Sequence, residues 1–100
     1  MIYDVEVTAT AEKDLDGIIA YLLSCGQPQA AAAFLGEFGH KKTLIAGNPE
    51  LYGFSRMPEL FTRGYRTFLF QRYIALYRLM ENRVLIDHVF HQRQDYASLI

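Results

Sequence analysis

Three β-rich segments near the end of the chain constrain its fold more than any other feature of the sequence. They are YRTFLF, YIALYRLM and RVLIDHVF, and only Gln71-Arg72 and Glu81-Asn82 separate them. Because two-residue connections join neighbouring antiparallel strands, this part of the chain predicts a three-stranded antiparallel meander. Neither connection has the Asn-Gly sequence that favours such turns, so a register shift of one residue stays open.

The first half of the chain predicts one strand and two helices. Residues 2–7, IYDVEV, favour a strand, and Thr8 or Thr10 can cap a helix whose apolar residues recur at helical spacing. Pro28 suits the first turn of a second helix, which Gly47-Asn48-Pro49 ends. The short connection between the helices predicts an antiparallel hairpin.

The predicted class is therefore α+β, in which a strand and a helix hairpin precede the meander and the helices pack on one face of the sheet. Residues 48–64 link the two parts through two prolines and two glycines, a length typical of loops that wrap the core or carry function. A chain of 100 residues is expected to form a single domain over residues 1–100.

The composition indicates the cellular compartment of the protein. The hydrophobic fraction of 51% is that of a folded chain, and no apolar run approaches the roughly 20 residues that span a bilayer. One cysteine, Cys25, cannot form an internal disulfide, which agrees with a reducing compartment. We expect a cytoplasmic protein with no membrane contact.

The cations are unevenly distributed although the net charge is only −1. From Arg56 onward there are seven arginines against four acids, whereas residues 1–55 carry three lysines against seven acids. Arginine presents a rigid fork of donors that matches phosphate or carboxylate, so the C-terminal half is the candidate binding half.

Two-residue turns would place alternate residues of the meander on opposite faces. One face would carry Tyr65, Thr67, Leu69, Ile74, Leu76, Arg78, Leu85, Asp87 and Val89, and its aliphatic end favours it as the face under the helices. The other would carry Arg66, Phe68, Ala75, Tyr77, Ile86 and His88 and would be open. Exposed Phe68, Phe70 and Tyr73 would then promote dimerisation or poor solubility.

The ending HVFHQRQDYASLI gathers His91, Arg93 and Tyr96 directly after the last strand, where they can fold back near Arg66 or Arg72. Arginines, a histidine and a tyrosine suit cleavage of a phosphodiester by its own 2′-hydroxyl, because they supply charge stabilisation, proton transfer and base stacking. A structural interpretation stays open, in which Asp95 pairs with Arg93 or caps a turn and Tyr96 closes the core. A metal site is not expected, since His88 and His91 lack further ligands.

Four stretches, TATAEKDLDGIIAYL, NPELYG, GYRTFLFQRYIALYRL and HVFHQRQDY, together resemble the RelE/ParE family of bacterial type II toxin–antitoxin toxins. The resemblance covers nearly the whole chain in order. It implies a toxin that causes growth arrest, works without a cofactor and is neutralised by a cognate antitoxin that wraps it.

The same resemblance is compatible with two cellular targets of the toxin, mRNA on the ribosome and DNA gyrase. RelE-like members cut mRNA on the ribosome without a metal, and this likeness would make Arg66, His91, Arg93 and Tyr96 catalytic. ParE-like members inhibit DNA gyrase, and the HxRxD pattern of His91, Arg93 and Asp95 is similar to their ending. A pI near 6.3 suits an RNA binder poorly.

We therefore expect a ParE-like gyrase inhibitor first and a RelE-like mRNA endonuclease second, with a non-toxic binding module of the same fold as a third alternative. Six residues are the expected partner contacts: Phe68, Phe70, Arg72, Tyr73, Tyr77 and His88. A homodimer is a further expectation.

Overall fold

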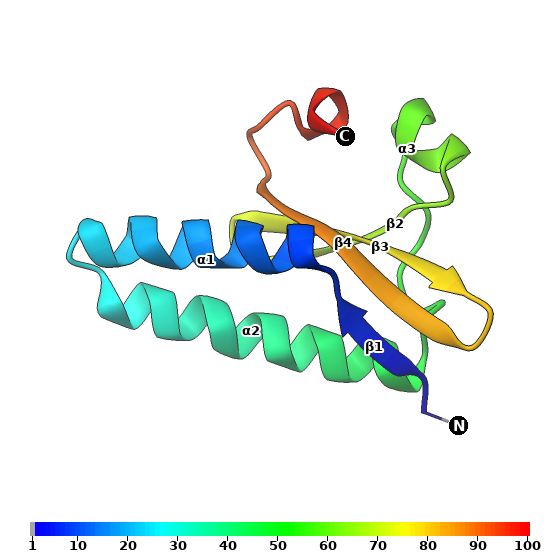
Figure 1. Ribbon diagram of the computed structural model, residues 1–100, viewed down its shortest axis with the longest axis horizontal. Helices are drawn as coiled ribbons and strands as arrows, with labels where there is room; N and C mark the ends of the chain where they lie inside the picture. The colour runs from blue at the N-terminus through cyan, green and yellow to red at the C-terminus, as the bar shows by residue number, and fades with distance from the viewer. Residues whose placement is uncertain (1) are drawn as a thin grey trace.

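A computed structural model describes residues 2–100 and confirms the predicted α+β class and the order of its elements (Figure 1). The elements are β1 (Asp4–Val7), α1 (Ala9–Ser24), α2 (Pro28–Gly47), α3 (Pro58–Thr62), β2 (Arg66–Phe70), β3 (Tyr73–Met80), β4 (Arg83–His91) and a final 3-10 turn, η1 (Tyr96–Leu99). Strands β2 to β4 form the antiparallel meander. Strand β1 joins it in parallel beside β4, so the sheet order is β1-β4-β3-β2.

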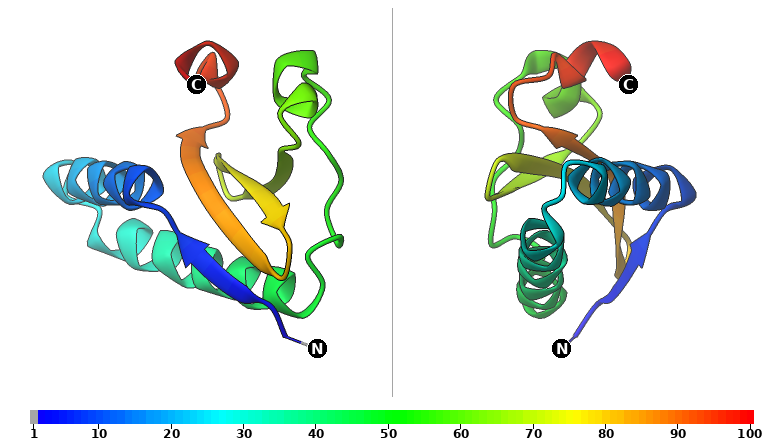
Figure 2. Two further views of the ribbon diagram at one scale, coloured as in Figure 1. Left: turned by 45° about the vertical axis from the view of Figure 1, so that its right-hand side comes forward. Right: turned by 90° about the vertical axis from the view of Figure 1, so that its left-hand side faces the viewer.

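The helix hairpin begins and ends where the sequence predicts. Thr8 caps α1, and its side-chain oxygen accepts a hydrogen bond from the Ala11 amide at 3.3 Å. Pro28 occupies the first turn of α2, and Gly47 is its last residue. The two helices run antiparallel along one side of the sheet (Figures 1 and 2).

Both connections of the meander are two-residue turns, but the first residue of each has a left-handed backbone. Gln71 has φ +54° and Glu81 has φ +55°. The meander keeps these turns without the glycine that normally relieves such a conformation. The pairing of Arg66 with Tyr77 and of Phe68 with Ala75 is as predicted.

A β-bulge in β4 alters the predicted register. Tyr77 pairs with Ile86, but the preceding Leu76 pairs with His88, so Asp87 is an extra residue without its own partner. Val89 consequently lies opposite Ala75 instead of His88. The bulge changes the strand neighbours of these residues: Val89 lies with Ala75 in the helix-covered core, where it was expected, and His88 lies opposite Leu76 on the other face.

The predicted assignment of the two sheet faces was wrong. Phe68, Phe70 and Tyr77, expected on the open face, are 2% exposed or less. They lie under α2, whose Phe34 and Phe38 pack against Phe70 at ring-centroid distances of 5.3 and 5.7 Å. Buried side chains of this kind are not available to a partner.

The helix-covered core therefore combines aromatic with aliphatic side chains. Its buried members are Ala11, Leu15, Leu22, Ala31, Phe34, Phe38, Ile45, Phe68, Phe70, Ala75, Tyr77, Val84, Ile86 and Val89. Tyr73 is partly buried at its edge. Since Phe68 and Phe70 are covered, they give no ground for expecting dimerisation or poor solubility, and of the three residues only Tyr73 stays partly exposed.

The opposite face of the sheet carries a second, smaller cluster. It consists of Leu60, Tyr65, Ile74, Leu76, Phe90 and Tyr96, with Met57, Ala97 and Ile100 packed against it. Helix α3 and the C-terminal turn supply the cover on this side, as Figure 2 shows above the strands. The face remains open near Leu69, which is 54% exposed.

The linker of residues 48–64 wraps the outer edge of the sheet. The Ser55 amide donates to the Tyr65 carbonyl at 2.9 Å, and the Thr67 amide donates to the Gly53 carbonyl at 3.2 Å. These bonds cover the beginning of the edge strand β2. No helix within residues 2–100 has the length and apolar character needed to cross a membrane.

The buried hydroxyl of Tyr77 ties the linker to the core, since it donates to the Pro49 carbonyl at 2.7 Å. Tyr77→Phe leaves that carbonyl unpaired, so we expect the free energy of unfolding to fall by about 1–2 kcal/mol in urea denaturation. Tyr21→Phe is the matched control, because Tyr21 is 67% exposed. Equal stability of the two variants would contradict a stabilising role for the bond between the Tyr77 hydroxyl and the Pro49 carbonyl.

Burial raises the pKa of Tyr77 from 10.0 to about 12. The folded chain therefore keeps a proton that the unfolded chain loses. The stability that this hydroxyl contributes is fully present below pH 10 and is lost as the pH rises toward about 12. We expect the free energy of unfolding to decline over this interval, and to decline less in Tyr77→Phe. Parallel slopes in the two proteins would count against this cause.

Candidate functional site

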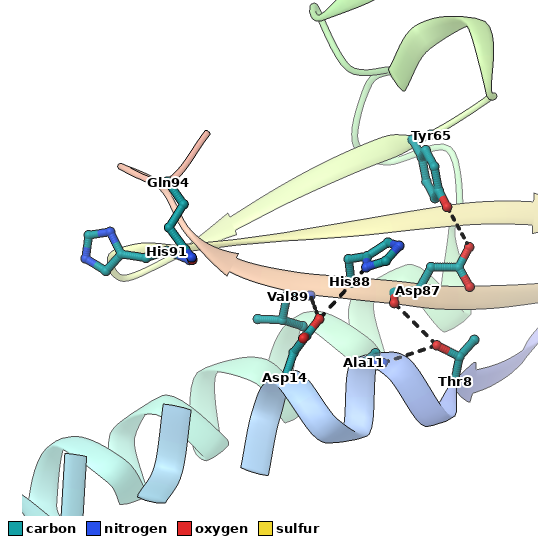
Figure 3. A network of polar contacts seen from close by, with 9 residues as sticks. All are labelled: Thr8, Ala11, Asp14, Tyr65, Asp87, His88, Val89, His91 and Gln94. Carbon is teal, nitrogen blue, oxygen red and sulfur yellow. Dashed lines mark hydrogen bonds and ion pairs between the residues drawn. The ribbon is translucent and has the colours of Figure 1, made fainter. Parts of the chain in front are cut away.

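The second half of β4 extends beyond its partner β1, and α1 satisfies part of the edge that is left. Pairing with β1 ends at Val7 and Ile86. Farther along, the Val89 amide donates to the Asp14 carboxylate of α1 at 3.0 Å, and His88 Nδ1 lies 4.0 Å from the same carboxylate (Figure 3). Asp14 thus fixes the C-terminal half of β4 against α1.

The bulged Asp87 is held on the other face of the sheet. Tyr65 donates its hydroxyl to the Asp87 carboxylate at 3.1 Å, and Arg78 Nε donates to the same oxygen at 2.7 Å. Burial, followed by the nearby Asp87 carboxylate, raises the pKa of Tyr65. These contacts stabilise the bulge and direct the strand toward its end at His91.

Gln92 joins the end of β4 to the β2–β3 turn. Its amide donates to the Arg72 carbonyl at 2.9 Å. Its side-chain nitrogen donates to the carbonyls of Gln71 and Tyr73 at 3.1 and 3.3 Å. The turn and the C-terminal segment therefore meet along one rim of the sheet.

A hollow of about 320 Å³ lies where these two segments meet. Its lining residues are Gln71, Arg72, His91, Gln92 and Arg93, and we call it the rim hollow. Of the residues expected to fold back near Arg66 or Arg72, His91 and Arg93 line this hollow together with Arg72. With two guanidinium groups, an imidazole and no carboxylate, the hollow is suited to holding an oxyanion.

His91 has a defined orientation in this hollow. Its Nδ1 accepts a hydrogen bond from the Arg93 amide at 3.1 Å. Its own amide donates to Gln94 Oε1 at 2.9 Å, and Figure 3 shows His91 and Gln94 together at the end of β4. The ring lies edge-on to Tyr73 at 5.5 Å. Because Nδ1 accepts, it carries no proton, and Nε2 is the nitrogen left to contact a ligand.

A larger groove runs from His91 along α1. It has a volume of about 590 Å³ and is lined by Lys13, Asp14, Gly17, Ile18, Tyr21, Tyr73, Val89, Phe90, His91 and Gln94. We call it the α1–β4 groove. It shares the lining residue His91 with the rim hollow, so the two lie next to each other.

The structure does not bring the four proposed catalytic residues together. Arg66 pairs with Tyr77 of β3, and His91 pairs with Tyr73 of the same strand. Arg66 and His91 are therefore separated by four residues along β3, which is about 13 Å at the usual rise of a strand. Arg66 donates from Nη1 to the Tyr52 carbonyl at 2.7 Å, and its guanidinium lies 4.0 Å from the Phe54 ring centroid.

Tyr96 is also separate from the hollow. It is buried in the cluster on the other face of the sheet, where its ring stacks on Phe90 at 6.0 Å, and burial raises its pKa. The structural interpretation, in which Tyr96 closes the core, describes this position. Among residues 2–100 no group of three His, Cys, Asp or Glu side chains is placed to hold a metal ion.

Of the six expected partner contacts, Arg72 is exposed and Tyr73 is half-buried. His88 is also half-buried, and it stacks on Phe90 at 5.4 Å. Sequence reasoning missed Asp14, Gln92 and Gln94. Asp14 had a detectable signal, because its position places a carboxylate beside the apolar stripe of Ala11 and Leu15.

Comparison with known proteins identifies the family. The family model described as the ParE toxin of type II toxin–antitoxin systems matches residues 5–96. The chain belongs to this ParE toxin family. No curated protein sequence matches it.

Two solved structures have the fold of this ParE-family chain. A chain of the chromosomal ParDE toxin–antitoxin system from P. aeruginosa is 17% identical, with a TM-score of 0.72 over 90% of this chain and 96% of that one. A chain of the RelBE2 complex from Mycobacterium tuberculosis is 24% identical, with a TM-score of 0.62 over 91% and 99%. At these identities the likeness shows the fold alone.

The Asp87 contacts predict that removing the charge of Asp87 destabilises this ParE-family chain more than removing the charge of Glu6 does. Asp87→Asn removes the charge paired with Arg78, whose side chain is 35% exposed, so we expect a loss of about 2 kcal/mol, less than a fully buried pair would give. The control Glu6→Gln breaks an exposed pair with Arg83 and should change stability by less than about 0.5 kcal/mol. Chemical denaturation measures both, and similar losses would contradict this account.

Proposed function

We propose that this chain is the toxin of a type II toxin–antitoxin pair, that it acts in the cytoplasm, and that it arrests growth by binding DNA gyrase. The observation that carries the proposal is the separation of Arg66 and Tyr96 from His91 and Arg93. An enzyme that cuts RNA with these four residues needs them around a single phosphate.

The contacts of Arg66 support binding over catalysis. Its guanidinium donates to the Tyr52 carbonyl and lies over Phe54, so it is already engaged by the linker. Tyr96 is covered and packed on Phe90. Both side chains thus make contacts within the fold away from the rim hollow.

The exposed rim favours a protein partner. Arg72 and Arg93 project from two connected segments, and the α1–β4 groove beside them includes Tyr21, which is 67% exposed. Exposed arginine and tyrosine side chains around a groove are typical of protein interfaces. Binding at this rim requires no bond to be broken.

A cognate antitoxin is the second partner in the proposal. The two similar structures come from a ParDE toxin–antitoxin system and a RelBE2 toxin–antitoxin complex. We expect an antitoxin of this chain to cover the rim and thereby to exclude the target.

One observation favours ribosome-dependent mRNA cleavage as a second candidate. His91 and Arg93 do meet Arg72 in one hollow, and no hydrogen bond among residues 2–100 engages His91 Nε2. A smaller nuclease site made of these three residues, without Arg66 and Tyr96, would still provide charge stabilisation and a group for proton transfer.

Induction of the chain alone in bacterial cells separates the candidates. We expect gyrase-dependent double-strand breaks and intact mRNA in primer extension, with both breaks and growth arrest reduced at least tenfold by Arg93→Ala. Arg66→Ala is the matched variant and should keep most of the activity. Cleavage of mRNA at codon boundaries that disappears in Arg93→Ala would overturn the gyrase proposal and establish the nuclease.

A further inference from the structure

The two arginines of the rim hollow lack an acidic partner within the fold. Among residues 2–100 the ion pairs are Arg78 with Asp87, Arg83 with Glu6 and, if protonated, His88 with Asp14. Arg72 and Arg93 take part in none of these, and both are exposed. Their charges are therefore available to a ligand.

The hollow is nevertheless an organised part of the fold. Gln92 bonds to the carbonyls of Gln71, Arg72 and Tyr73 and so fixes the β2–β3 turn against the chain that follows β4. The bond from the Arg93 amide to His91 Nδ1 orients that chain further. Arg72 and Arg93 are consequently presented together, although they are 21 residues apart in the sequence.

We infer that the rim hollow binds carboxylates of an acidic segment of a partner protein, with Arg72 and Arg93 as the contacts. The inference deepens the proposed function and rests on it for the partner being a protein. Arginine forks match carboxylates bidentately, and the hollow has no acidic lining residue to repel them.

Charge favours an acidic protein segment over a nucleic acid. The chain as a whole has a net charge of −1, and the rim offers two guanidinium groups, whereas proteins that bind nucleic acids through their backbone neutralise many phosphates. Lys13, in the adjoining groove, is accompanied by Asp14 and adds little net charge. A few carboxylates match this rim better than a polyanion does.

The α1–β4 groove indicates which other side chains the bound segment should carry beside its carboxylates. It shares the lining residue His91 with the hollow, and Ile18, Tyr21 and Tyr73 are among its other lining residues. An apolar side chain of the partner can pack there while the neighbouring acids reach Arg72 and Arg93. The preferred segment therefore alternates acidic and large apolar residues.

The test uses a fluorescein-labelled peptide of alternating Glu and Leu, with fluorescence anisotropy as the readout. We expect the peptide to bind the full chain, and its affinity to fall at least tenfold in the double variant Arg72→Gln with Arg93→Gln. The matched control, Arg56→Gln with Arg63→Gln, removes the same charge from exposed arginines outside the hollow and should bind as the parent chain does. A peptide with Gln in place of Glu should bind at least tenfold more weakly than the Glu peptide.

Three results would overturn the inference: no binding of the Glu peptide, equal loss in both double variants, or tighter binding of an oligothymidylate of the same net charge. The last result would assign the hollow to a nucleic acid. Gyrase-dependent breaks measured in cells distinguish this inference from the proposed function. Breaks without peptide binding reject the acidic-segment inference alone, whereas peptide binding without breaks rejects gyrase as the target.

Discussion

The structure depends on β4 having hydrogen-bond partners on both of its sides. Strand β3 pairs with it from Arg83 to His91, but β1 reaches only from Arg83 to Ile86. Beyond that point the bulge at Asp87 and the bond from Val89 to Asp14 replace a neighbouring strand. This arrangement lets β4 project past β1, with α1 beside it, and creates the rim on which the proposed binding depends (Figure 3).

Much of the fold was predictable because its signals are local. The turn spacing gave the meander, and Thr8, Pro28 and Gly47 marked the helix ends. The face assignment failed because both faces of the sheet carry apolar residues, so the pattern does not distinguish them. The bulge changes in addition which residues of β4 share a face, and it places Val89 opposite Ala75. A bulge is set by tertiary contacts such as those of Asp87 with Tyr65 and Arg78.

The candidate site was predictable in part. The tail HQRQDY was identified as functional, and His91 and Arg93 do lie with Arg72. Sequence proximity could not show that Tyr96 turns into the other face, because a buried stacking contact with Phe90 decides its position. Nor could it show the bonds from Gln92 to the turn, which depend on the strand register. In the proposed function the rim binds through its arginines, whereas Phe90 and Tyr96 stabilise the fold by stacking on each other.

The central claim is that Arg72 and Arg93 act as one site from which Arg66 is excluded. Double-mutant cycles on growth inhibition, read from the inducer dose that halves the growth rate of cells expressing each variant, test it most directly. The account predicts that Arg72→Ala and Arg93→Ala are strongly non-additive, whereas Arg66→Ala and Arg93→Ala combine additively. Strong coupling between Arg66 and Arg93, with none between Arg72 and Arg93, would contradict it.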